Sequence, residues 1–293
     1  MKAAAFDYIR ARSLDEVCQA LADGDGEARI IAGGQTLIPL MAMRMARPET
    51  LIDINDIGEL SGIETGGDFV TIKACTRQAD ILASDAVRAA LPVLPDALSH
   101  VGHTQTRNRG TVGGSLVNAD PSAEIPLIAR LLDADMTARS ISGERTIPAA
   151  GFFDSAMMTT LEPEECLVDV RFPVWPADRT GHGFHESSIR DSDFALAAAA
   201  AQLTLDQSGN CARLHLAIGG ATPAPWRLDA VEAALTGGDL SDEAIEAAIA
   251  DIPDMVEPQS DVHADADYRR RVARVLAGRA ICDARDRAKG DRA

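Results

Sequence analysis

Two glycine pairs, each beside residues with hydroxyl groups, constrain this 293-residue chain more than any other feature. The first lies in AGGQT at residues 32–36, and the second in TVGGS at residues 111–115. Consecutive residues without side chains let several backbone N–H groups approach one diphosphate, because no Cβ keeps the anion away. The helix expected after the first pair, capped by Thr36 and running over 37–45, adds further unpaired N–H groups. Two ordinary tight turns are the alternative interpretation.

The common nucleotide-binding and metal-binding motifs do not occur in this sequence. The sequence contains neither the P-loop pattern GxxxxGK[ST] nor GxGxxG after the first strand, which disfavours ATPase and NAD-type Rossmann functions. The five cysteines are scattered, so we expect reduced thiols and no zinc or iron–sulphur site on this chain. The H-x-x-H pairs at 100–103 and 182–185 have no third ligand, and we interpret them as packing or surface histidines.

The charge balance disfavours several classes of partner. The net charge is −17, whereas binding to nucleic acid or to anionic membranes depends on lysine and arginine. The longest apolar run, over 194–201, is far shorter than the ~20 residues that span a bilayer. The N-terminal segment lacks the apolar core of a signal peptide. We therefore expect a cytoplasmic protein without a membrane span.

Short strands alternate with helices along the chain, which indicates an α/β or α+β fold. A capping box at 13–16 opens the first helix. The segment 173–183, rich in proline, glycine and charge, is the best domain boundary. Residues 110–115 are expected to form a second glycine turn. The other expected strands are 28–32, 51–54, 69–76, 167–173 and 213–218, and the other helices are 80–91, 94–101, 125–132, 228–235, 241–249 and 267–283.

Several longer segments, in order along almost the whole chain, match one known family. They include AGGQTLIPLM at 32–41, RPETLID at 47–53, QTRNRGTVGGS at 105–115 and NADPSAE at 118–124, followed by shorter matches at 152–153, 193–195, 218–220 and 267–270. The chain thus resembles the medium, FAD-binding subunits of molybdenum hydroxylases of the carbon monoxide dehydrogenase and xanthine dehydrogenase type.

The resemblance implies an α+β fold with two domains. Residues 1–176 would form a two-subdomain FAD-binding domain of the vanillyl-alcohol oxidase (PCMH) type. Residues 177–285 would form the smaller α+β C-terminal domain of CO dehydrogenase flavoproteins. The last ten residues are charged, so we expect a frayed end, with 286–293 as a charged tail. The resemblance also implies a strand over 194–205, although its alanines favour a helix by intrinsic propensity.

The resemblance further implies that both glycine segments hold the diphosphate of FAD, and that a carboxylate at Glu124 lies near its sugar hydroxyls. An exposed charge at a helix start is the alternative for Glu124. Valine at Gly33 or Gly113 is expected to abolish FAD retention and to leave the fold soluble. The family pattern places cofactor contacts at Ala32, Gly33, Gly34, Gln35, Thr36, Leu37, Thr111, Gly113, Gly114 and Ser115.

The sequence departs from the family pattern at three positions. Thr36 stands where serine is commoner, His103 where we expect an acidic residue, and Glu186 where some relatives carry a lysine that contacts the cofactor. The first change keeps the hydroxyl, whereas the third removes one contact. Asp193 is a further candidate for shaping the flavin pocket.

The function implied by the resemblance is electron transfer without direct contact with the organic substrate. A large partner subunit would carry molybdopterin, and a small partner would relay electrons through two 2Fe–2S clusters to FAD in an (αβγ)2 assembly. This agrees with the lack of catalytic residues and metal ligands among the sequence motifs. The organic substrate and the electron acceptor, whether NAD, oxygen or a quinone, stay open. The alternatives are a stand-alone FAD-dependent oxidase and an FAD-free assembly subunit.

Overall fold

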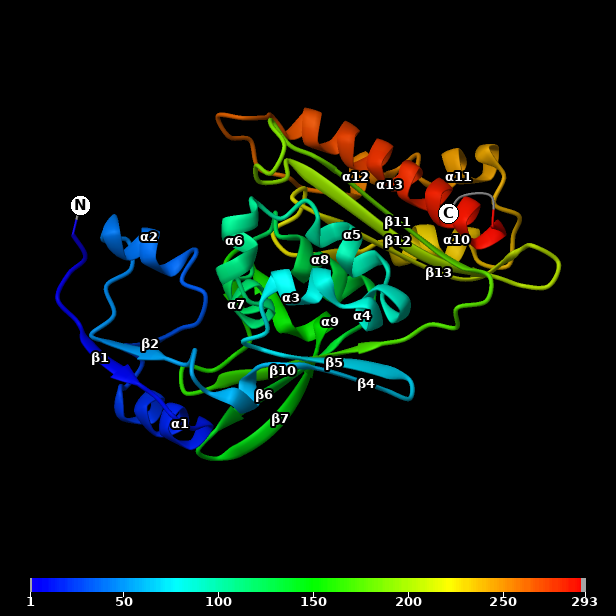
Figure 1. The fold of residues 1–293 in the computed structure, drawn as a ribbon. Helices are drawn as coiled ribbons and strands as arrows, with labels where there is room; N and C mark the ends of the chain where they lie inside the picture. Colours follow the sequence, from blue (N-terminus) through cyan, green and yellow to red (C-terminus); the bar gives the residue numbers. More distant parts are fainter. Residues whose placement is uncertain (1, 291–293) are drawn as a thin grey trace.

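The computed structural model describes residues 2–290 and arranges them in three larger sheets with helices between and around them (Figure 1). The first sheet is parallel, with strand order β1-β3-β2, formed by β1 (Asp7–Arg10), β2 (Ala28–Ile31) and β3 (Thr50–Asp53). The helices α1 (Leu14–Asp23) and α2 (Leu37–Ala42) connect these strands. The side chain of Ser13 accepts a hydrogen bond from the N–H of Glu16, which confirms the predicted helix start.

The second sheet is antiparallel and supports a layer of short helices. Its order is β4-β5-β10-β6-β7, which brings β10 (Cys166–Pro173) between β5 (Phe69–Lys73) and β6 (Asp135–Ser140). The outer strands are β4 (Ile63–Gly66) and β7 (Gly143–Pro148). The helices are α3 (Gln78–Ala83), α4 (Asp85–Ala90), α5 (Val93–Leu98), α6 (Thr104–Arg109), α7 (Val112–Asn118), α8 (Glu124–Leu131) and α9 (Ala149–Phe152), with a 3-10 turn at Gly58–Leu60 and a small hairpin of β8 (Phe153–Ser155) and β9 (Met158–Thr159).

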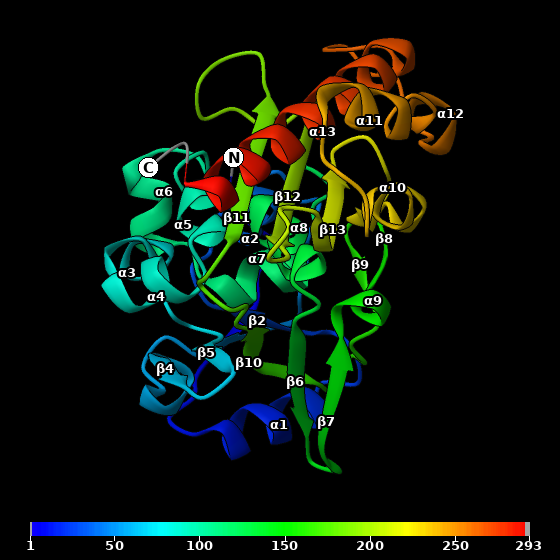
Figure 2. The same cartoon turned by 90° about the vertical axis from the view of Figure 1, so that its right-hand side faces the viewer.

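The third sheet is antiparallel and begins at Thr180. Its strands follow the order β11 (Thr180–Ser187), β12 (Ala197–Leu205), β13 (Cys211–Gly219) and β14 (Trp226–Arg227). The long helix α13 (Ala266–Lys289) lies across β11 and β12 on the face away from the second sheet (Figures 1 and 2). The smaller helices α10 (Asp229–Leu235), α11 (Asp242–Ala248) and α12 (Ile252–Met255) pack beside it.

The strand β12 confirms the expectation for residues 194–205 and shows why alanines occur there. Ala198 and Ala200 belong to the core shared with the helical layer of the second sheet. Ala197, Ala199 and Ala201 belong to the core beneath α13. Both faces of the strand are therefore buried, and small side chains let helices approach the sheet on each side. This packing outweighs the helix propensity of alanine.

The structure corrects several predicted boundaries. Residues 110–115 are no turn, because Gly113 and Gly114 lie in the first turn of α7. The predicted helix 80–91 is split at Ser84, whose side chain caps α4. The helix α2 ends at Ala42 and gains no side-chain cap from Thr36. The segments α6, β6 and β7 were not predicted, and β11 begins inside the expected boundary 173–183.

The C-terminal helix also differs from the prediction. The frayed tail proposed for 286–293 is wrong for 286–289, since α13 continues to Lys289 and Gly290 caps it in a left-handed conformation. The remaining residues, 291–293, lie outside the described range. Across residues 2–290, no helix is both long enough and apolar enough to cross a membrane.

Candidate cofactor site

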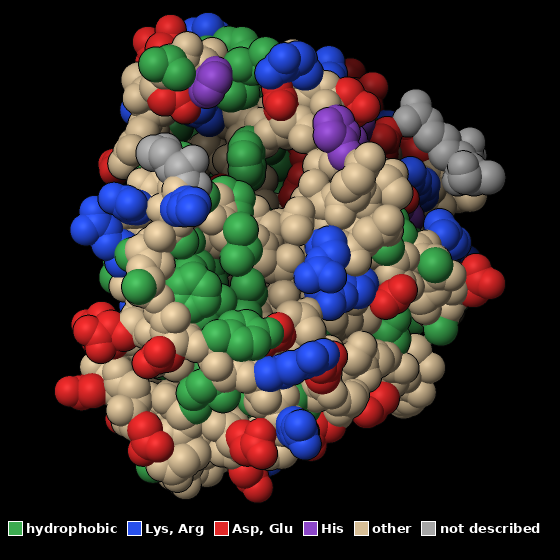
Figure 3. All heavy atoms as spheres, turned by 60° about the vertical axis from the view of Figure 1, so that its left-hand side comes forward, with side chains coloured by type: hydrophobic (Ala, Val, Ile, Leu, Met, Phe, Trp, Pro, Cys, Tyr) green, Lys and Arg blue, Asp and Glu red, His purple; other side chains and the backbone are tan. Residues whose placement is uncertain are grey.

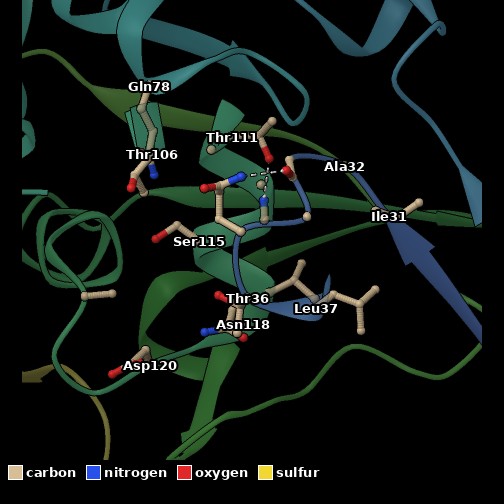
Figure 4. Close-up of a pocket in the computed structure, with 18 of the residues that line it drawn as sticks. Ile31, Ala32, Thr36, Leu37, Gln78, Thr106, Thr111, Ser115, Asn118 and Asp120 are labelled. Atoms are coloured by element: carbon tan, nitrogen blue, oxygen red, sulfur yellow. Dashed lines mark hydrogen bonds between the residues drawn. The ribbon is translucent and has the colours of Figure 1, made fainter. Parts of the chain in front are cut away.

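Both glycine segments line one cavity of about 830 Å³ between the first sheet and the helices of the second. The first segment follows β2, at the carboxyl ends of parallel strands, where α/β sheets place ligands. The molecule is hollowed on this side, and hydrophobic side chains run down into the hollow (Figure 3). In Figure 4, Ala32, Thr36 and Leu37 face Thr111, Ser115 and Asn118 across the site. The predicted convergence of the two segments is thus confirmed.

Gly33 fixes the closest approach between the two segments. A Cβ on this residue would overlap the carbonyl oxygen of Arg109 and would stand 3.0 Å from the Cα of Gly110. The backbones of residues 33 and 109–110 therefore pack directly against each other. Gly34 has a φ of +71°, a left-handed conformation that favours glycine. These two residues are required for backbone packing and turn geometry in addition to any role in binding.

The first segment presents an uninterrupted row of free N–H groups. Among the described residues, no acceptor pairs with the backbone N–H of residues 33–37. Five consecutive free donors beside a cavity form the type of concave cradle that binds phosphate oxygens. The residues present at this wall therefore fit a diphosphate group such as that of FAD.

In the second glycine segment, most backbone N–H groups are already hydrogen-bonded within the protein. The N–H of Gly113 donates to the carbonyl of Ala74 at 2.9 Å, and that of Ser115 donates to the carbonyl of Thr111. The hydroxyl of Thr111 accepts a hydrogen bond from the N–H of Gly114 and so caps α7. Gly114 itself is exposed in the cavity wall, where the absence of a side chain leaves space. The second segment therefore has fewer free N–H donors than the first. Its main contribution is space at Gly114, which would let a bound group approach the backbone closely.

Gly113 is a glycine for a structural reason. A Cβ on it would come within 2.6 Å of the Cβ of Ala74 and 2.8 Å of the carbonyl oxygen of Ala74. The expectation that valine at Gly33 or Gly113 leaves the fold intact is therefore not supported, because the added atoms would meet backbone in both cases.

Glu124 begins α8 and lines the cavity with only 8% of its surface exposed. An exposed charge at a helix start is therefore the wrong description of this residue. Burial raises the pKa of Glu124 to about 8, with a further contribution from the nearby carboxylate of Glu186. At neutral pH the carboxyl group is therefore mainly protonated, and it can both donate and accept a hydrogen bond.

Glu186 pairs with a histidine at the edge of the cavity region. Oε1 of Glu186 lies 3.4 Å from Nδ1 of His100, and this hydrogen bond raises the pKa of His100. Oε2 of Glu186 is buried and has no hydrogen-bond partner among the described residues. The buried carboxylate of Glu186 is thus paired with the partly exposed ring of His100, next to Glu124.

The remaining histidines of the H-x-x-H pairs lie apart from the cavity or at its edge. His182 and His185 point to opposite faces of β11, where they bind Asp96 and Asp283 respectively. His103 and Asp193 both line the cavity. Sequence reasoning missed Gln78, Thr106 and Asp120 as lining residues, although Thr106 and Asp120 lie within the matched segments 105–115 and 118–124. It also missed Asn55 and Arg77, which lie behind the glycine segments.

Comparison with known proteins identifies the family. A model described as "FAD binding domain in molybdopterin dehydrogenase" matches residues 4–175. A second, the "CO dehydrogenase flavoprotein C-terminal domain", matches residues 182–284. The chain belongs to the medium, FAD-binding subunits of CO dehydrogenase and xanthine dehydrogenase-type molybdenum hydroxylases. Medium subunits of this family are components of dehydrogenase complexes.

The similarity to individual medium subunits extends over nearly the full length. The chain is 38% identical to the 6-hydroxypseudooxynicotine dehydrogenase complex subunit alpha of Paenarthrobacter nicotinovorans, over 99% of this chain and 97% of that protein. The structure of carbon monoxide dehydrogenase from Hydrogenophaga pseudoflava superposes with a TM-score of 0.94 at 35% identity, covering 97% of this chain and 98% of the other. Quinoline 2-oxidoreductase from Pseudomonas putida 86 gives 0.93 at 36% identity, covering 98% and 99%. The α+β fold expected from the sequence is confirmed.

Proposed function

We propose that this medium subunit binds one FAD in the cavity between the glycine segments and relays electrons within a molybdenum hydroxylase complex. The observation that carries the proposal is the row of five free N–H groups at residues 33–37. These donors would hold the diphosphate, while the exposed Gly114 in the opposite wall allows the cofactor to approach the backbone closely. When bound, FAD supplies the redox chemistry, accepting electrons and passing them to an external acceptor.

The protein's own part is to bind and orient the cofactor. Glu124 would hydrogen-bond a sugar hydroxyl, and its protonated form removes the cost of burying a charge beside the diphosphate. Thr111 would keep the first turn of α7 capped, so that Gly114 stays in place at the cavity wall. These residues position the cofactor and take no part in substrate chemistry.

The partners in the proposal are a large molybdopterin subunit and a small subunit with two 2Fe–2S clusters, joined in an (αβγ)2 assembly. The relatives support this, since one is named as the alpha subunit of a dehydrogenase complex and another as a medium chain. The related carbon monoxide dehydrogenase structure from Hydrogenophaga pseudoflava lacks the Mo-pyranopterin moiety, and its description names a molybdenum cofactor for that enzyme. The organic substrate would then bind to the large subunit.

Cofactor binding is tested by titrating the apo chain with FAD and recording the visible spectrum. We expect flavin bands and binding of one FAD per chain. If no flavin is retained after reconstitution, the chain is an assembly subunit without FAD and the proposal fails.

Electron relay is tested with the native complex, whose large subunit also identifies the substrate. Under anaerobic conditions the substrate should reduce the flavin of the complex, whereas the isolated, FAD-loaded medium subunit should stay oxidised. Reduction of the isolated subunit by substrate would instead establish a stand-alone oxidase.

A further inference from the structure

The two glycine segments belong to different parts of the fold, so their spacing depends on noncovalent contacts. The first follows β2 of the parallel sheet, and the second forms the start of α7, which lies above the antiparallel sheet. Asn55 stands just beyond β3, next to β2, and its Nδ2 donates to the carbonyl of Ala32 at 2.9 Å. The same amide nitrogen donates to Oδ1 of Asp53 at 2.6 Å, which fixes its orientation. Asn55 therefore holds the start of the first segment from behind.

Arg77 joins this asparagine to the second segment. Its Nη2 donates to Oδ1 of Asn55 at 2.6 Å, and its Nη1 donates to the carbonyl of Arg109 at 2.6 Å. Arg109 is the residue whose carbonyl packs against Gly33. One guanidinium group thus links the first glycine segment to the backbone just before the second, through a chain of hydrogen bonds from Arg109 by way of Arg77 and Asn55 to Ala32.

The backbone at Arg77 is itself tied to the second segment. Arg77 and Thr111 form an isolated β-bridge, in which the N–H of Gln78 donates to Gly110 and that of Val112 donates to Thr76. The base of the arginine is therefore fixed to the second segment, and only its guanidinium reaches toward the first. A substitution of the Arg77 side chain therefore removes the link to the first segment while the backbone bridge to the second segment remains.

We propose that Arg77 is a positioning residue that sets the distance between the two glycine segments and so preorganises the cavity for a dinucleotide. The part of this proposal that concerns FAD depends on the proposed function, whereas the link between the segments does not. The planar guanidinium offers two donors in fixed geometry, so it can bind two acceptors simultaneously. Lysine has one flexible ammonium group and cannot reproduce both bonds at these positions.

The experiment compares Arg77→Ala and Arg77→Lys with the unchanged chain, using hydrogen exchange of the apo protein and FAD titration. The amides to follow are hydrogen-bonded ones on each side: Ile38 and Leu40 after the first segment, Gly110 just before the second segment, and Val112 within it. Both sets should exchange at least threefold faster in both variants, and the FAD dissociation constant should rise tenfold or more. Added methylguanidinium should restore binding to Arg77→Ala but not to Arg77→Lys.

The matched control is Arg88→Ala. Arg88 also donates to a backbone carbonyl, that of Leu82, but this contact lies away from both segments. The Arg88→Ala variant should leave the exchange of all four amides and the FAD dissociation constant unchanged.

A second comparison is Asn55→Ala, which should weaken FAD binding to a similar extent as Arg77→Ala. Combining it with Arg77→Ala should add little, because the two residues act in one chain of contacts.

The outcomes separate this inference from the proposed function. If the unchanged chain binds no FAD, the proposed function fails, and the exchange rates alone then test the link. Unchanged exchange at either segment in Arg77→Ala overturns the link. Faster exchange with an unaltered FAD dissociation constant overturns the claim that the link preorganises the cavity. Equal rescue of Arg77→Ala and Arg77→Lys by methylguanidinium also contradicts the proposed geometry.

Discussion

Gly33 packs against the backbone carbonyl of Arg109, so closely that no other residue type fits between the two glycine segments. The contact joins the loop after β2 to the end of α6, and both Gly33 and the neighbouring Gly110 line the cavity. Glycine at this position therefore sets how near the two walls can come.

The substitution Gly33→Ala is expected to destabilise the apo chain by about 2 kcal/mol, because the added Cβ forces two backbone segments apart. The Gly33→Ala variant should also weaken FAD binding, because the distance between the two glycine segments increases. Urea unfolding and FAD titration measure the two effects. Unchanged stability and affinity in Gly33→Ala would contradict the packing described above.

Valine at Gly114 should weaken FAD binding and also destabilise the apo chain slightly. This residue is exposed in the cavity wall, and a Cβ there meets only the hydroxyl of Thr111, at 2.8 Å. We expect the FAD dissociation constant to rise at least tenfold, a loss of about 1.4 kcal/mol of binding free energy. The apo chain should lose about 1 kcal/mol of stability, because the added Cβ displaces the hydroxyl that caps α7. Alanine at the same position is the milder control and should give an intermediate affinity. Full flavin retention by the valine variant would remove this wall from the cofactor site.

Glu124 should make the apo chain less stable as the pH rises. Its pKa in the folded chain, about 8, exceeds the ordinary value of 4.5, so the unfolded chain ionises first. Stability is therefore lost progressively between about pH 4.5 and pH 8, by roughly 2–5 kcal/mol at about 1.4 kcal/mol per pKa unit. Glu124→Gln should flatten this pH profile in urea unfolding. The control is Glu64→Gln at an exposed position, which should keep the pH profile of the unchanged chain. Equal pH profiles of stability for Glu124→Gln and the unchanged chain would rule out the buried, protonated carboxyl group.

Glu186→Gln should lower the pKa of His100. The hydrogen bond with Glu186 raises that pKa, and so favours the charged imidazolium in the folded chain. The stabilisation from this pair is present below the ordinary histidine pKa of about 6.5 and is lost as the pH rises through the raised folded value. A nuclear magnetic resonance titration of the His100 ring measures the change. An unaltered titration in Glu186→Gln would show that the pair does not form.

Alanine at Gly183 should destabilise the C-terminal domain by about 3 kcal/mol. Its Cβ would overlap the carbonyl of Ala280, because α13 lies directly on β11 at this point, as it also does at Gly181 and Ala284. Thermal or urea unfolding measures the loss. Gly58→Ala is the control, since a Cβ there meets nothing within 4 Å. Equal stability of the two variants would contradict the close packing of helix and strand.

Local sequence determined those features that depend on neighbouring residues. Ser13 and Glu16 define the start of α1 within three residues of each other. The AGGQT segment contains the glycines that its turn requires, and the order of the motifs along the chain sufficed to identify the family. The strand at 197–205 was predicted only through this resemblance, because alanine favours helix in isolation.

Tertiary structure decided the features that join distant residues. Gly113 and Gly114 lie in a helix, where Gly113 packs against Ala74, and the pattern of glycines does not distinguish this from a turn. The burial that protonates Glu124, and the contacts of Arg77 with Asn55 and Arg109, arise only when separate elements pack together. The physical reason is that hydrogen-bond geometry and desolvation depend on which groups meet in space, and spacing along the chain does not specify either.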